Sequence, residues 1–96
     1  MNKEVTEEKL TKYFSITKEA LDMATKAEKR ADMKKEAADF LDMASRYYSD
    51  AQHFKDKGDY VLAFGALNYA HGWLDAGARI SLFKVKDSRL FTVDDE

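Results

Sequence analysis

The chain has 96 residues, of which 45% are hydrophobic and 35% are charged, and its 16 basic and 18 acidic side chains leave a formal net charge of −2. This length has room for one small domain, which we expect to span residues 1–96. The chain contains no cysteine, which excludes disulfides, thiol catalysis and zinc–thiolate sites. Its charges are well mixed, which disfavours nucleic acid and anionic membranes as partners.

The first predicted helix spans about residues 6–29. Thr6 can cap the free N–H groups of its first turn, and Glu7 and Glu8 place negative charge at its positive end. Apolar residues then recur at spacings of three and four, with lysines and glutamates between them, which is typical of an amphipathic helix.

The second predicted helix spans about residues 33–57, with Asp32 as a possible cap. No glycine or proline marks the boundary before it, so the alternative is one bent helix over residues 6–57. A break near Asp32 gives three segments of nearly equal length, and matched antiparallel helices bury one another's apolar stripes. We therefore favour the break.

The third predicted helix spans about residues 59–83 and follows a tight turn at Gly58-Asp59, because glycine ends a helix and aspartate caps the next one. One of its stripes comprises Tyr60, Ala63, Leu67, Ala70, Leu74 and Gly77, and a second comprises Leu62, Ala66, Tyr69, Trp73, Ala76, Ile80 and Phe83. Two apolar stripes require two neighbouring helices. Residues 84–96 lose the helical period, although Leu90, Phe91 and Val93 are apolar enough to fold back over the bundle. The predicted fold is all-α, an antiparallel three-helix bundle with a short irregular C-terminal tail.

Two motifs carry a family resemblance: Tyr47-Tyr48-Ser49-Asp50-Ala51 in the second predicted helix and Asn68-Tyr69-Ala70-His71-Gly72-Trp73-Leu74-Asp75-Ala76-Gly77 in the third. With Phe54, Gly58-Asp59 and Ala63, they resemble the archaeal family catalogued as domain of unknown function 357. The resemblance covers the second and third predicted helices well and the first loosely. It implies a small helical bundle in an archaeal cytoplasm. The family has no assigned activity, so the resemblance implies no functional residues.

A polar edge runs along the third predicted helix, where Asn68, His71, Asp75 and Arg79 follow one another at spacings of three and four. These side chains could hold a small anion or polarise a carbonyl, so one interpretation is a binder of a small polar ligand. His71 and Asp75 could begin a metal site, although the sequence offers no complete set of metal ligands. The simpler interpretation is that His71/Asp75 and Asp75/Arg79 are pairs that stabilise a solvated face by about 0.2–0.5 kcal/mol each.

Arg46 and His53 lie two turns apart on the second predicted helix. An arginine and a histidine at about this spacing resemble the pair in helical RNases of the HEPN type, which makes such an RNase the alternative enzymatic interpretation. Asp42 and Asp50 flank both cations and would repel an RNA phosphate. The residues otherwise form an ordinary polar helix face, and we assign no catalytic residue.

The small residues of the third predicted helix suggest an interface. Each of its glycines costs about 1 kcal/mol relative to alanine, and close approach of another helix is the usual reason for them. We predict an interface at Gly65, Tyr69, Gly72, Trp73 and Ala76. We therefore expect a non-enzymatic protein–protein interaction or assembly module, binding a protein partner or itself as a homodimer, without a cofactor.

The N-terminal residues lack the apolar core of a signal peptide. The most apolar window, residues 60–83, carries the four residues of the polar edge, which a membrane-spanning helix would have to bury. The sequence therefore predicts a cytoplasmic protein without a membrane segment.

Overall fold

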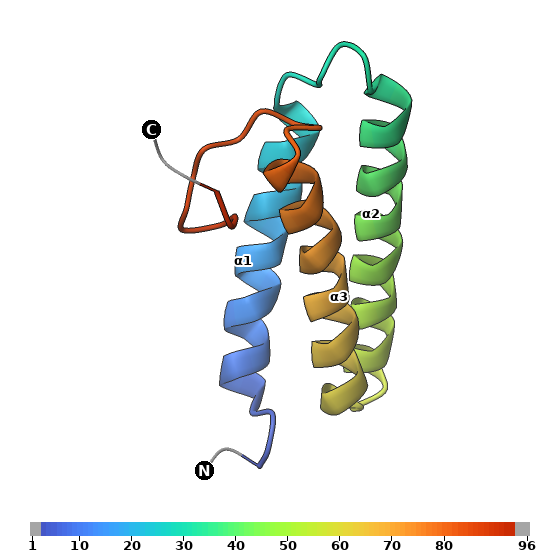
Figure 1. Ribbon diagram of the computed structural model, residues 1–96. Coiled ribbons are helices and arrows are strands. Elements are labelled where there is room, and N and C mark those ends of the chain that lie inside the picture. Colours follow the sequence, from blue (N-terminus) through green and yellow to red (C-terminus); the bar gives the residue numbers. More distant parts are fainter. Residues whose placement is uncertain (1–2, 94–96) are drawn as a thin grey trace.

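The computed structural model describes residues 3–93 and contains α1 (Glu7–Lys26), α2 (Lys34–Asp56) and α3 (Tyr60–Arg79) (Figure 1). α1 and α3 run in one direction and α2 runs in the other. α3 packs against both other helices, most extensively against α2, while α1 and α2 contact each other least. The predicted all-α, antiparallel three-helix bundle is confirmed. Within the described residues, no helix combines the length and apolarity needed to cross a bilayer.

Side-chain caps start two of the three helices. Thr6 Oγ1 and Asp59 Oδ1 each accept a hydrogen bond of 3.1 Å from the backbone N–H three residues later. The prediction that Asp32 caps the second helix is wrong. The N-cap of α2 is Met33, which makes no side-chain cap bond, and Asp32 instead accepts a hydrogen bond of 2.9 Å from Arg30 Nε.

Two helices end earlier than predicted. α1 stops at Lys26 instead of near residue 29, and α3 stops at Arg79 instead of near residue 83. An isolated antiparallel bridge joins Lys29 to Phe83 through two backbone hydrogen bonds of 2.9 Å made by the neighbouring residues. The bridge requires extended backbone on both sides, so neither helix can continue through it. α2 differs from its predicted range by one residue at each end.

Gly58 closes the turn between α2 and α3 with a φ of +80°. Its N–H donates to the carbonyl of Lys55 at 2.9 Å, and the N–H of Asp59 donates to the carbonyl of Phe54 at 2.9 Å. These two bonds define a Schellman motif, which requires left-handed backbone that glycine adopts without strain.

The first predicted stripe of α3 lies in the core, where Ala63, Leu67, Ala70, Leu74 and Gly77 are all buried. Around it are two clusters: one toward the α2–α3 turn includes Leu10 and Phe14, and one at the other end includes Leu21 and Ala44. The second predicted stripe is only partly covered, since Leu62, Tyr69 and Ile80 are about half exposed. α3 therefore has more apolar surface than its neighbours cover.

The C-terminal segment, residues 81–93, folds back along the bundle on the side of α1 (Figure 1). Leu90 and Phe91 are buried in the same cluster as Leu74, and Val93 packs against that cluster. These three residues therefore cover the bundle as the sequence predicts. The Arg89 guanidinium, hydrogen-bonded to Asp87, holds the pKa of that carboxyl below its ordinary value. Residues 94–96 of the predicted tail lie outside the described part of the chain.

Candidate functional site

His71 links α3 to α1 and to the C-terminal segment. Its Nε2 lies 2.7 Å from the backbone carbonyl oxygen of Leu90, and because a carbonyl can only accept, Nε2 carries the proton. Its Nδ1 lies 3.0 Å from Oγ1 of Thr17, a buried residue of α1. In this tautomer the Thr17 hydroxyl donates to Nδ1. Both nitrogens are therefore engaged, and neither is available to a metal ion or a substrate proton.

Asp75 also faces the C-terminal segment, because its Oδ1 accepts a hydrogen bond of 2.8 Å from the N–H of Thr92. The ion pairs expected from the spacing, His71/Asp75 and Asp75/Arg79, do not form among residues 3–93. Asn68 and Arg79 are exposed. The polar edge thus divides into His71 and Asp75, which hold the C-terminal segment, and Asn68 and Arg79, which face solvent. Ligand binding by all four residues stays a prediction.

Arg46 and His53 lie on the exposed side of α2. Arg46 Nε lies 3.0 Å from Asp42 Oδ2, one turn earlier, and the Arg46 side chain is 71% exposed. The His53 ring packs beside Phe54, with centroids 5.9 Å apart. Two helical turns separate Arg46 from His53 by about 10.5 Å along the axis. An RNA phosphate would have to compete with Asp42 for Arg46, so no contact of this pair favours the RNase interpretation.

Large apolar side chains are exposed along the solvent side of α3. Within the described residues, the exposed large hydrophobic side chains are Val61 (70%), Leu62 (51%), Tyr69 (53%) and Ile80 (47%). All four belong to α3 or its C-cap, and helical spacing places them on one side of the helix together with Gly65, Gly72 and Ala76, which are also exposed. We call these seven residues the outer face of α3.

The two glycines of the outer face have open space above them. A Cβ atom added at Gly65 or Gly72 would meet no atom within 4 Å. Gly77 differs, because the Phe83 ring covers it and an added Cβ would lie 2.8 Å from Phe83 Cε1. Packing within the fold therefore explains glycine at position 77 but leaves the glycines at positions 65 and 72 unexplained.

An apolar hollow of about 220 Å³ opens at the edge of the outer face that borders α2. We call it the aromatic notch; it is lined by Phe40, Tyr69, Gly72, Trp73 and Ala76. The Phe40 and Trp73 rings pack edge to face with centroids 4.9 Å apart. The buried indole Nε1 of Trp73 has no hydrogen-bond partner in the described part of the chain. The exposed lining of the notch is almost entirely apolar, so an apolar or aromatic side chain suits it better than a polar ligand.

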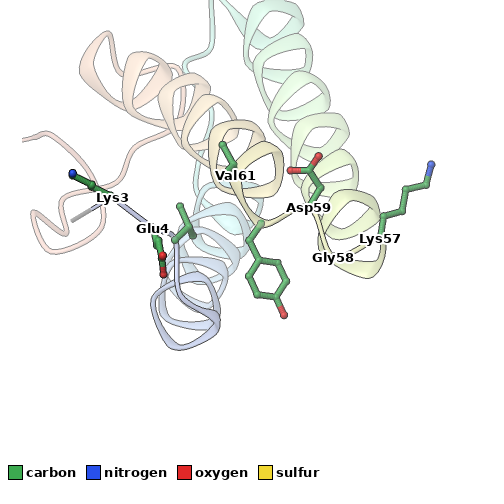
Figure 2. A pocket seen from close by; sticks show the side chains of 8 residues that line it. Lys3, Glu4, Lys57, Gly58, Asp59 and Val61 are labelled. Atoms are coloured by element: carbon green, nitrogen blue, oxygen red, sulfur yellow. The ribbon is translucent and has the colours of Figure 1, made fainter. Parts of the chain in front are cut away.

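A larger hollow of about 550 Å³ lies at the opposite end of the bundle from the C-terminal segment, where residues 3–5 approach the α2–α3 turn. Its lining includes Lys3, Lys57 and Asp59. Figure 2 shows that the Lys3 and Lys57 side chains extend away from each other on opposite sides. Ligand sites use polar groups that converge on one point, so we assign no ligand to this hollow.

Four of the five predicted interface residues, Gly65, Tyr69, Gly72 and Ala76, lie exposed on the solvent side of α3, and Trp73 is half-buried at its edge. Sequence reasoning missed Val61, which belongs to neither predicted stripe, and Phe40, which lies on α2. Val61 could have been found by continuing the spacing from Gly65 back by one turn. The position of Phe40 beside Trp73 depends on how α2 and α3 are aligned, for which the sequence contains no local signal.

A family model described as "Protein of unknown function (DUF357)" matches residues 12–83. The match extends from Lys12 of α1 through all of α2 and α3 to the bridge residue Phe83, so it includes more of the first helix than the motifs suggested. It also includes the whole outer face and the residues that line the aromatic notch. No curated protein and no solved structure matches the chain.

Proposed function

The chain belongs to this DUF357 family of proteins of unknown function, and we propose that it is a non-enzymatic interaction module that self-associates as a homodimer through the outer face of α3. Its proposed setting is the archaeal cytoplasm that the sequence resemblance implies. One observation carries the proposal: the exposed large hydrophobic side chains of the described residues gather on this one face. Surface apolar residues are ordinarily scattered, and contiguous ones mark contact with another molecule.

The glycines of the outer face support the same function energetically. Gly65 and Gly72 together sacrifice about 2 kcal/mol of helix preference relative to alanine, and no contact within the fold requires them. Glycine allows the backbone of another helix to approach closely, which a side chain at either position would prevent. A symmetric dimer is the commonest way for a protein to bury such a surface.

The C-terminal segment does not cover the outer face. It is held by His71 and Asp75, whereas Tyr69 remains 53% exposed and Gly72 is open to solvent. α3 therefore presents the anchors of the C-terminal segment on one side and the apolar surface on another. A partner can reach the outer face without displacing any part of the chain that the structure describes.

The substitution Gly72→Leu tests the proposed function. Leucine is a better helix former than glycine and its side chain would project from the middle of the outer face, so the helices should stay intact while close approach is blocked. Sedimentation should show that the parent protein changes from monomer to dimer with concentration and that the variant remains a monomer. Circular dichroism should show the same helix content in both.

Trp73 provides a second measurement, because it is the one tryptophan of the sequence and lines the aromatic notch. Its fluorescence should shift with concentration in the parent and not in Gly72→Leu. The matched control is Ala38→Leu, which adds the same side chain to an exposed position of α2. This control should dimerise like the parent. A parent that sediments as a monomer up to about 1 mM, the weakest range of specific association, would remove the support for self-association.

A further inference from the structure

Given the proposed function, on which this inference rests, we infer that the partner of α3 is α3 of a second copy in antiparallel orientation, with Tyr69 of each copy seated in the aromatic notch of the other. The pattern of side-chain sizes along the outer face, the distribution of charge along α3 and the position of the notch each indicate this arrangement.

The outer face has a symmetric pattern of side-chain sizes. Six of its seven residues form three pairs that are equidistant from the midpoint between Ala70 and His71: Val61 with Ile80, Gly65 with Ala76, and Tyr69 with Gly72. The seventh, Leu62, has Arg79 as its mate. The outer pair is bulky, the next pair is small, and the inner pair combines a large residue with a small one. A two-fold axis that lies between the two copies at the level of this midpoint, perpendicular to α3, places each residue opposite its mate in the second copy.

This register matches large residues with empty space. Tyr69 faces Gly72 of the second copy, and nothing within 4 Å occupies the position of a Cβ at that glycine. Gly65 faces Ala76, so the two helix backbones can approach closely on either side of the tyrosines. Val61 and Ile80, which are 70% and 47% exposed, then cover each other at both ends of the contact.

The charges of α3 are complementary only when two copies run in opposite directions. Between Asp59 and Ile80, the charged residues are Asp59, Asp75 and Arg79. Asp75 is turned toward Thr92, which leaves Asp59 at the start of the helix and Arg79 at its end. An antiparallel pair brings each Arg79 toward the start of the other helix, whereas a parallel pair places like charges side by side. The helix dipoles favour the same orientation.

The start of α3 is open to such a contact. Figure 2 shows Val61 and Asp59 at the first turn of α3, with Lys57 extending away from them. The Asp59 side chain is exposed and uses Oδ1 for the cap bond to Leu62, which leaves Oδ2 for a cation. Arg79 makes no ion pair among the described residues and is long enough to reach beyond the residue directly opposite it.

The size of the contact sets the expected affinity. α3 has 20 residues and is therefore about 30 Å long, and a helix face is about 10 Å wide. This stripe of about 300 Å² is smaller than the about 800 Å² per partner of a standard interface, even with the neighbouring side chains of α2, and belongs with the small, transient contacts. We therefore expect a dimer that dissociates in the micromolar range, and the experiment uses protein concentrations on both sides of it.

Crosslinking tests the orientation, and the absence of natural cysteine makes it unambiguous. Val61→Cys and Ile80→Cys are purified separately, mixed in equal amounts and treated with a short bismaleimide that spans the 8–10 Å typical between packed helices. The mixture should give a covalent dimer of one chain of each variant, identified by its mass. It should form at least about tenfold faster than either variant crosslinks to itself, because crosslinking within a complex has an effective concentration near millimolar.

A second pair of variants tests the seat of Tyr69. Tyr69→Ala should weaken the dimer at least tenfold and abolish the concentration-dependent shift of Trp73 fluorescence, whereas Tyr69→Phe should keep both. Val61→Cys crosslinking to itself as fast as the mixture would overturn the antiparallel orientation while leaving a dimer through α3 in place. Mixtures of each variant with Ala38→Cys, whose cysteine is exposed on α2, give the background rate of crosslinking. If neither Val61→Cys nor Ile80→Cys, alone or mixed with the other, crosslinks faster than this background, and the parent sediments as a monomer, the proposed function itself fails.

Discussion

Three glycines on one helix have different physical roles, which only their surroundings reveal. Gly77 lies beneath the fully buried Phe83 ring, so the absence of a side chain there lets the C-terminal segment pack onto α3. Gly65 and Gly72 have no neighbour within 4 Å of a Cβ position. In the isolated monomer, these two glycines only weaken the helix.

Alanine substitution separates these roles. Gly77→Ala gains about 1 kcal/mol of helix preference but forces Phe83 to move, which costs about 1–3 kcal/mol in a packed core, so the free energy of unfolding should fall. Gly65→Ala has the same gain of helix preference without a clash, so it should raise the free energy of unfolding by up to about 1 kcal/mol. Urea melts at low protein concentration measure both values without a contribution from association. Equal effects at the two positions would contradict the contact with Phe83.

At the scale of the element, the ends of α2 and α3 share one motif with different residues. At the end of α3, the N–H of Ser81 donates to the carbonyl of Ala78 and the N–H of Leu82 donates to that of Gly77, and Ser81 has a φ of +59°. This is the same Schellman arrangement that Gly58 makes at the end of α2. The end of α2 could be predicted because a glycine marks it. The end of α3 could not, because a serine occupies the left-handed position.

The remaining differences from the prediction arise from contacts distant in sequence. Lys29 and Phe83 leave the helical pattern because they bridge to each other, and neither has a local signal for it. Helical spacing aligns the four residues of the polar edge, which predicts one continuous edge. The structure divides it, since Thr17 and the C-terminal segment return to His71 and Asp75. The helices, the caps of α1 and α3 and the apolar stripes follow from local spacing, whereas the partners of individual side chains depend on the packed bundle.

The two left-handed positions give opposite predictions. Gly58→Val places a β-branched side chain in left-handed backbone and should lower the free energy of unfolding by about 1–2 kcal/mol, although no atom lies within 4 Å of its Cβ. Ser81→Gly relieves backbone strain at the end of α3 and should raise the free energy of unfolding by up to about 1 kcal/mol. Gly58→Asn should lose less than Gly58→Val, because asparagine tolerates this backbone conformation. Thermal or urea melts of the three variants make the comparison.

At the scale of the whole molecule, α3 is central to both folding and the proposed association. Its inner side and the His71/Asp75 edge hold α1, α2 and the C-terminal segment, while its outer face is open to solvent. The contacts that stabilise the monomer and those proposed for the dimer therefore involve different residues. A domain of this size has a small margin of stability. Because the residues of the proposed dimer contact are separate from those of the core, the contact surface can change without unfolding the domain.

Two truncations of apolar side chains should therefore have reciprocal effects. Leu90 is 4% exposed and packs in the core, so Leu90→Ala should lower the free energy of unfolding of the monomer by about 2–5 kcal/mol. Val61 is 70% exposed, so Val61→Ala should change it by no more than about 0.5 kcal/mol. For the dimer the order reverses: Val61→Ala should weaken association, and folded Leu90→Ala should associate with the affinity of the parent. Urea melts at low protein concentration measure the free energy of unfolding of the monomer. Sedimentation under conditions below the unfolding transition measures the affinity of the dimer. If Leu90→Ala lost association as well while still folded, the C-terminal segment would have to contribute to the dimer contact, and the division between the two sides of α3 would be wrong.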